Sequence, residues 1–177
     1  MTIFINILTI SRIIASALIF ILMTFSEKYY LMLFLFFYAS ITDYFDGYLA
    51  RKYDSQSLIG EILDPIADKI LVIFVLIALS VNLSSYYIGF LSALIISREV
   101  WVAALRDINS RRGKASATKV SKISKAKTSL QMLTILVYLS GLAFNFLLLI
   151  IIGDLLLMIS FLITFYTGYL YTRSSFL

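Results

Sequence analysis

Two pairs of aspartates are the residues of this sequence whose types and spacing are best suited to chemistry. Asp43 and Asp46 are three positions apart, and Asp64 and Asp68 are four positions apart. Residues at these spacings share one face of a helix, so each pair presents two carboxylates together. The polar segment 52–59 is short enough to make the two helices antiparallel neighbours. We therefore expect the four carboxylates to face one another.

Clustered carboxylates repel one another and are costly in a membrane segment unless a cation neutralises them. Mg²⁺ and Mn²⁺ prefer oxygen ligands, and two such ions can share four carboxylates. A two-metal site of this kind neutralises phosphates and activates an attacking hydroxyl. The plainer interpretation is that the aspartates pair with nearby cations, namely Arg51, Lys52 and Lys69.

Composition limits both the class of protein and its chemistry. Of the 177 residues, 61% are hydrophobic and 14% are charged, and there is no cysteine and no histidine. Without these residues, disulfides, thiolate chemistry and the commonest general base are excluded. The apolar fraction is too large for a soluble domain, so we predict an integral membrane protein with no nucleic-acid partner.

Apolar segments suited to crossing a bilayer, at about 20 residues each, recur along the whole chain. The predicted spans are 7–25, 29–50, 60–79, 86–105, 128–148 and 151–172. Turns are expected at 82–85, at Asn145 and at Gly153-Asp154. We predict one all-α membrane domain over 1–177, with six transmembrane helices and a short N-terminal juxtamembrane segment.

Basic residues are divided very unequally between the two predicted sides of the membrane. Of 15 Lys and Arg residues, all but Lys28 lie on or near one side, and eight lie in segment 106–127. The positive-inside rule makes that side cytoplasmic, together with both termini. The charges either set orientation and attract anionic lipids or also bind an anionic substrate. We predict a multi-pass protein of the plasma (inner) membrane.

Small and basic residues accompany the aspartates. Gly47, Ala50 and Gly60 leave room for a ligand, or alternatively for a neighbouring helix, to approach closely. Arg51 follows Gly47 by one turn and is placed either to bind a pyrophosphate or to anchor the helix at the cytoplasmic interface. Both groups of residues are compatible with a phosphate site beside the carboxylates.

Together these residues form the pattern D-x2-D-G-x2-A-R-x8-G-x3-D-x3-D, which begins at Asp43 and ends at Asp68. The pattern resembles the signature of the CDP-alcohol phosphotransferase family at every fixed position. The resemblance implies six transmembrane helices around a polar cavity open to the cytoplasm, and a homodimer. Two departures lie outside the pattern: Ile5 replaces the family's usual proline, and Ser124 an expected glycine.

The resemblance also implies a reaction and residue roles. Family members transfer a phosphatidyl group from CDP-diacylglycerol to an alcohol and release CMP. The four aspartates correspond to ligands of two Mg²⁺ or Mn²⁺ ions, and Asp68 also to the general base. The residues expected to bind CDP-diacylglycerol are Asn6, Thr9, Gly47, Ala50, Arg51, Ser57 and Gly60.

The expected acceptor is sn-glycerol 3-phosphate, because the resemblance is strongest to family members that use it. A phosphorylated acceptor requires cations, and the candidates are Arg98, Arg106, Lys125 and Lys127. Arg98 has the alternative of pairing with Glu99 or with an aspartate of the pattern. Arg106 lies on roughly the same helical face as Arg98.

Two other functions stay open at this stage. One is a related transferase that uses serine, inositol phosphate or phosphatidylglycerol as acceptor. The other is a cation-coupled membrane transporter that uses the aspartates as its ion site. Against a transporter, the aspartates lie near one rim of the membrane and the sequence shows no duplicated halves.

Overall fold

The computed structural model describes residues 2–52, 58–113 and 122–176, with side chains for 6–42, 63, 65–113 and 126–176. This part of the chain is entirely helical, as predicted, and contains no strand. Its six helices are α1 (Thr2–Phe25), α2 (Tyr29–Lys52), α3 (Leu58–Asn82), α4 (Tyr86–Arg111), α5 (Lys122–Ala143) and α6 (Leu147–Phe176).

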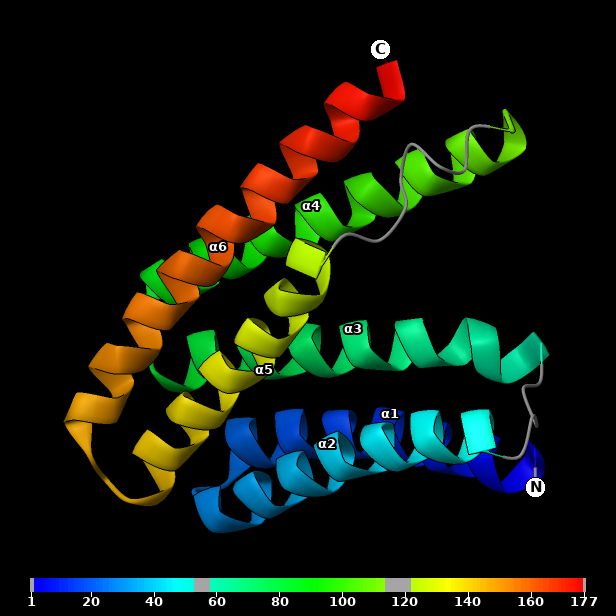
Figure 1. Ribbon diagram of the computed structural model, residues 1–177. Helices are drawn as coiled ribbons and strands as arrows, with labels where there is room; N and C mark the ends of the chain where they lie inside the picture. The colour runs from blue at the N-terminus through cyan, green and yellow to red at the C-terminus, as the bar shows by residue number, and fades with distance from the viewer. Residues whose placement is uncertain (1, 53–57, 114–121, 177) are drawn as a thin grey trace.

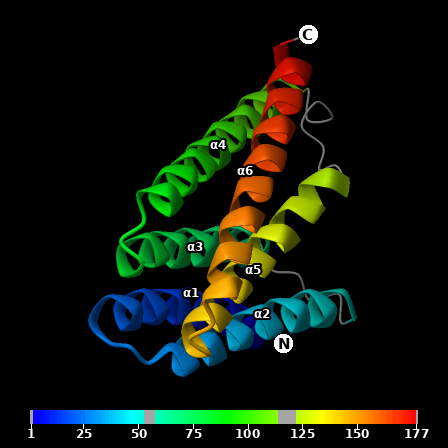
Figure 2. The same cartoon turned by 90° about the vertical axis from the view of Figure 1, so that its left-hand side faces the viewer.

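Successive helices run in opposite directions, so both termini lie away from the α1–α2, α3–α4 and α5–α6 turns (Figure 1). α2 and α3 run in opposite directions, as the short segment between them predicts. In the described part of the chain they have little direct contact with each other, because α1 packs extensively against both. Figure 2 shows α4 and α6 rising steeply from the group formed by α1, α2 and α3. Away from the turns the helices diverge: α2 ends near the N-terminus, and α4 ends near the C-terminus of the chain (Figure 1).

Four described segments are long and apolar enough to cross a membrane: Asn6–Phe25, Pro65–Asn82, Tyr86–Arg111 and Leu147–Phe176. A shorter apolar segment, Tyr29–Thr42, lies in α2. These segments have the length and composition of a multi-pass membrane protein. They overlap four of the six predicted spans, and the crossings by α2 and α5 stay a prediction.

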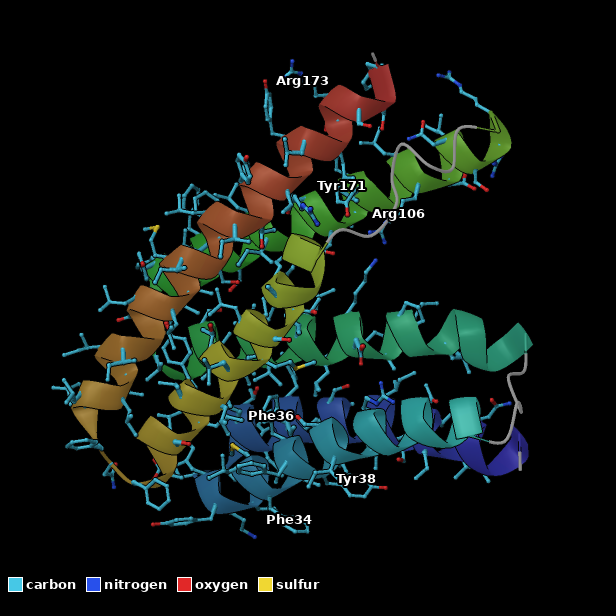
Figure 3. All side chains as sticks on the ribbon, in the orientation of Figure 1. Phe34, Phe36, Tyr38, Arg106, Tyr171 and Arg173 are labelled. Atoms are coloured by element: carbon cyan, nitrogen blue, oxygen red, sulfur yellow. The ribbon has the colours of Figure 1, made fainter. Side chains whose placement is uncertain are left out.

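α2 shows how the helices divide their apolar residues between core and surface (Figure 3). Phe36 points into the bundle and is 2% exposed, whereas Phe34, two positions earlier, is 65% exposed. Two positions are about 200° apart on a helix, so the two rings lie on opposite faces. An exposed phenylalanine face is suited to contact with lipid chains.

Buried apolar residues from all six helices form one core. Its largest fully buried apolar side chains include Ile19, Met23, Met32, Leu71, Leu76, Leu79, Ile88, Ile95, Ile135 and Leu139. Because these residues lie mainly in the halves of the helices near the three tight turns, that end of the bundle is tightly packed.

The turn predicted at 82–85 is confirmed. Ser84 adopts a positive φ of 47°, and Ser85 caps α4 by accepting a hydrogen bond from the backbone N–H of Ile88. Asn82 closes α3 by donating its side-chain N–H to the carbonyl of Met23, at 3.0 Å. Ser85 thus satisfies one N–H of the first turn of α4, and Asn82 satisfies one carbonyl of the last turn of α1 and ties the end of α3 to it.

The turn predicted at Asn145 is also confirmed, with a φ of 51°, which is a conformation that asparagine tolerates well. Several helix boundaries differ from prediction. α5 ends at Ala143 and α6 begins at Leu147, so the predicted limits at 148 and 151 are wrong. α1 is continuous from Thr2, so the expected juxtamembrane segment is part of this helix, and α4 extends past its predicted end to Arg111.

Gly153 and Asp154 lie inside α6 and do not break the helix, contrary to prediction. A Cβ added at Gly153 would lie 2.8 Å from ring atoms of Tyr138, so glycine is what allows this ring to fit. The Tyr138 hydroxyl donates to Asp154 Oδ1 at 2.6 Å. Both residues therefore serve the packing of α6 against α5.

We predict that Gly153→Ala destabilises the protein by about 1–3 kcal/mol, because fully buried Tyr138 has little room to move. The measurement is thermal unfolding in detergent. Gly89→Ala is the matched control, since its added methyl would meet only the Ser80 side chain at an ordinary 3.6 Å. Equal melting temperatures for the two variants would contradict the packing described here.

Candidate functional site

A pocket of about 230 Å³ lies where α3, α4 and α5 meet. One wall is apolar and includes Val72, Ile95 and Met132. The other wall is polar and charged; its residues are Asp68, Lys69, Arg98, Glu99, Arg106, Lys127, Thr128 and Gln131. This wall contains four cations and two carboxylates, so its charge is positive.

Arg98, Arg106 and Lys127 are three of the four cations that the sequence predicts for an anionic acceptor. The structure places all three on this pocket, beside Asp68. Arg98 and Arg106 reach it from the same face of α4, as their spacing predicts. The side chain of Lys125, the fourth predicted cation, lies outside the described residues.

Asp68 lies on the pocket wall and pairs with an arginine in the interior of the bundle. Its Oδ1 accepts a hydrogen bond from Arg12 Nη1 at 2.7 Å, and the two side chains form an ion pair. The Arg12 side chain is fully buried, whereas that of Asp68 is 38% exposed. Arg12 therefore fixes one carboxylate oxygen of a residue that lies on the pocket wall.

Arg12 was not among the predicted site residues. Its signal in the sequence is that it stands alone within the apolar segment Asn6–Phe25. An arginine inside a membrane span needs a partner, and a carboxylate is the most effective one. The sequence offers ten acids, and only the packing of α1 against α3 selects Asp68.

Glu99 pairs with two of the pocket's cations. Its Oε1 accepts a hydrogen bond from Arg98 Nη1 at 2.9 Å and also pairs with Lys127 Nζ. The alternative that Arg98 pairs with Glu99 is confirmed, and this pairing does not remove Arg98 from the pocket. Glu99 thus joins α4 to α5 and offsets part of the charge that would otherwise separate Arg98 from Lys127.

Two other cations of the pocket have no carboxylate partner among the side chains that the structure describes: Lys69 and Arg106. Arg106 Nε is buried and makes no hydrogen bond there, and the same holds for Nε2 of Gln131. Buried donors without acceptors cost free energy. An anion with several oxygens, such as a phosphate, would satisfy them.

The sequence comparison identifies the family. The chain matches the CDP-alcohol phosphatidyltransferase family over residues 3–167. It belongs to this family.

Several relatives of this phosphatidyltransferase share the name CDP-diacylglycerol–glycerol-3-phosphate 3-phosphatidyltransferase. The protein from Wigglesworthia glossinidia brevipalpis is 39% identical over 141 residues, which are 80% of this chain and 76% of that protein. The Sodalis glossinidius protein is 39% identical over 105 residues, or 59% of this chain and 58% of that protein. The Escherichia coli K12 protein is 38% identical over 101 residues, or 57% and 56%. The alignments with the last two therefore span somewhat over half of those proteins.

The structure places the backbone of the family's aspartate signature on two helices. Asp43 and Asp46 lie near the end of α2, and Asp64 and Asp68 lie on α3. Of these, only Asp68 has a described side chain, and no group of three metal-binding side chains occurs within the described part of the chain. The signature side chains outside the description are those of Asp43, Asp46, Gly47, Ala50, Arg51, Gly60 and Asp64, and Ser57 lies entirely outside the described residues.

The two N-terminal residues that the family resemblance assigns to the nucleotide lie on α1. Thr9 is fully buried, and Asn6 is half-buried at the start of the same helix. Both lie on the helix that carries Arg12, and Thr9 precedes Arg12 by three residues. α1 therefore carries both the residues predicted to bind the nucleotide and the arginine that pairs with Asp68.

We predict that Arg12→Met lowers the stability of this phosphatidyltransferase by about 1.5–3 kcal/mol, because it removes the buried hydrogen-bond donor of the Asp68 carboxylate. Thermal unfolding in detergent measures the change. The matched control is Arg111→Met, which removes an exposed ion pair with Asp107 and is expected to cost less than about 1 kcal/mol. A similar small loss in both variants would contradict the assigned role of Arg12.

Proposed function

We propose that this protein transfers the phosphatidyl group of CDP-diacylglycerol to sn-glycerol 3-phosphate, giving phosphatidylglycerophosphate and CMP. Family membership and the names of its relatives support this reaction. The structural observation that carries it is the pocket in which Asp68 lies beside Lys69, Arg98, Arg106 and Lys127.

The charge of the pocket favours a phosphorylated acceptor over a neutral one. Glu99 already pairs with Arg98 and Lys127, whereas Lys69 and Arg106 have no such partner among the described side chains. A phosphate group would bring at least one negative charge and several acceptor oxygens to these donors. The hydroxyl of a neutral alcohol would leave them unsatisfied.

Asp68 is suited to the role of general base in this reaction. It lies on the pocket wall, where the acceptor hydroxyl would approach, and Arg12 fixes its Oδ1. In the proposed step, Asp68 takes the proton of the glycerol 1-hydroxyl. The hydroxyl oxygen then bonds to the phosphorus that carries diacylglycerol, and the bond to the CMP oxygen breaks. The protein contributes mainly by placing and orienting these groups.

The four aspartates of the signature fit two divalent cations, Mg²⁺ or Mn²⁺, because each has carboxylate oxygens that such ions bind. Asp43, Asp46, Asp64 and Asp68 would hold them. Bound there, the ions would offset the charge of the pyrophosphate and lower the pKa of the attacking hydroxyl. The partial exposure of Asp68 toward the pocket is compatible with this role.

The remaining parts of the proposal concern the nucleotide and the membrane. CDP-diacylglycerol binds along the start of α1 and the signature, through Asn6, Thr9, Gly47, Ala50, Arg51, Ser57 and Gly60. The six helices span the plasma (inner) membrane as one domain and surround a polar cavity open to the cytoplasm, and two copies form a homodimer. Both termini then face the cytoplasm, and the lipid tails of the donor stay in the bilayer.

The decisive experiment measures CMP release by purified protein in detergent with CDP-diacylglycerol and Mg²⁺ or Mn²⁺. Glycerol 3-phosphate, serine, inositol phosphate and phosphatidylglycerol are offered one at a time. We expect release with glycerol 3-phosphate alone. Release with a different acceptor would keep the reaction type and overturn the acceptor, whereas no release would favour a transporter.

Asp68→Asn is expected to lower the rate of CMP release by about 10²–10⁴-fold, because it removes the proposed base. Asp107→Asn is the matched control, since this acid lies on α4 and forms only an exposed pair with Arg111. Both variants are compared at saturating substrates after gel filtration has shown that they are folded. An Asp68→Asn enzyme as fast as wild type would exclude Asp68 as the base.

Arg106→Met is expected to raise the KM for glycerol 3-phosphate by about 10- to 150-fold, the range for losing one hydrogen bond to a charged group. The KM for CDP-diacylglycerol should change little, because Arg106 lies on the acceptor side of the pocket. Initial-rate measurements with each substrate varied in turn test this. A rise confined to CDP-diacylglycerol would place Arg106 on the donor side instead.

A further inference from the structure

The two arginines of the pocket are supported from behind by α6, a helix that does not line the pocket. The support consists of three residues: Thr167, Gly168 and Tyr171. All three are buried, and none has a role in the proposed chemistry. Their contacts with Arg98 and Arg106 show what they do.

Tyr171 lies beneath both guanidinium groups. The Cζ atom of Arg98 is 5.8 Å from the centre of the Tyr171 ring, and that of Arg106 is 5.6 Å from it. Figure 3 shows Tyr171 and Arg106 together between α6 and α4. The face of an aromatic ring attracts cations, and the attraction is strongest away from water. One ring thus holds two like charges near each other on the pocket wall.

Thr167 and Gly168 set the path of the Arg98 side chain. Thr167 Oγ1 accepts a hydrogen bond from Arg98 Nη2 at 2.6 Å. A Cβ added at Gly168 would lie 3.0 Å from both Cγ and Nε of Arg98, which is closer than such atoms normally approach. A larger residue at this position would therefore displace the Arg98 side chain by a few tenths of an ångström.

Further polar contacts fix α6 in register with α4. Trp101 Nε1 donates to Thr172 Oγ1 at 2.9 Å, and Asn109 Nδ2 donates to Ser175 Oγ at 2.7 Å. Both α6 partners follow Tyr171, by one and by four residues. They favour one register of α6 against α4, in which the ring and the glycine are aligned with the two arginines.

We infer that Thr167, Gly168 and Tyr171 are positioning residues that hold Arg98 and Arg106 in place to bind the phosphate of the acceptor. The inference rests on the proposed function and extends it to a helix outside the pocket. Two guanidinium groups held over one ring repel each other, and a phosphate placed between them relieves that repulsion. The support thereby sets the affinity for a phosphorylated acceptor and leaves binding of the lipid donor unchanged.

Tyr171→Leu tests the role of the ring. We expect the KM for glycerol 3-phosphate to rise by about 3- to 30-fold, the range that corresponds to losing a cation–π contact, with the KM for CDP-diacylglycerol unchanged. Tyr171→Phe keeps the ring and is expected to restore most of the affinity. Tyr169→Leu is the matched control, because Tyr169 is on the same helix but is 62% exposed. Equal losses in the Leu and Phe variants, or an equal rise in both KM values, would overturn the inference.

Gly168→Ala tests the clearance independently of the ring. It should raise the KM for glycerol 3-phosphate in the same direction, because the added methyl displaces Arg98. Gly89→Ala on α4, whose methyl would meet only the Ser80 side chain of α3 at an ordinary distance, should leave this KM unchanged. Unchanged acceptor KM in a folded Gly168→Ala enzyme would contradict the positioning role of Gly168.

Calorimetric binding of glycerol 3-phosphate separates this inference from the proposed reaction. If the wild type binds glycerol 3-phosphate but releases no CMP, the reaction is wrong, while weaker binding by Tyr171→Leu than by Tyr171→Phe still supports the positioning role. If the wild type releases CMP and all variants bind glycerol 3-phosphate equally, the inference fails and the reaction stands. If the wild type does not bind glycerol 3-phosphate, the inference fails.

Discussion

A charged side chain inside an apolar helical bundle is stable only where the structure gives it a partner, and the contacts between helices follow this constraint. Arg12 of α1 meets Asp68 of α3, and Glu99 of α4 meets Lys127 of α5. Each pair joins two helices that are distant in sequence or separated by a long connection. The same contacts that neutralise buried charge also build the walls of the pocket. Stability and site geometry therefore depend on the same ion pairs.

The pairing is incomplete, and this incompleteness gives the pocket its chemical character. Glu99 serves two cations at once, while Lys69 and Arg106 have no carboxylate partner among the described side chains. An enzyme that binds an anionic substrate needs such a surplus, because fully paired cations would have to break an ion pair to bind. The cost of keeping unpaired cations is reduced by the ring of Tyr171, which attracts positive charge without neutralising it.

The two ends of the bundle differ in the way they are held together. Near the three tight turns, apolar packing dominates, and polar contacts such as that between Tyr138 and Asp154 fix pairs of helices. Toward the other end, α4 and α6 diverge from α3 (Figure 1), and the pocket between α3, α4 and α5 has a charged wall. An apolar, tightly packed end and a charged pocket suit an enzyme that joins a lipid substrate to a charged, water-soluble one. This division matches the proposed reaction of a CDP-alcohol phosphatidyltransferase.

The sequence by itself determined the all-helical class, the turns at 82–85 and at Asn145, the opposite directions of α2 and α3 and the family, because these depend on local pattern and spacing. It also indicated Arg98, Arg106 and Lys127 as neighbours of one site, since helical periodicity and charge already restrict them. Only the tertiary structure decided that Arg12 pairs with Asp68 and that α6 supports the two arginines. The break wrongly predicted at Gly153-Asp154 has the same origin. In the sequence the glycine indicates the end of a helix, whereas in the fold it leaves space for the Tyr138 ring. Such partners are selected by long-range packing, which the spacing of residues along one helix does not encode.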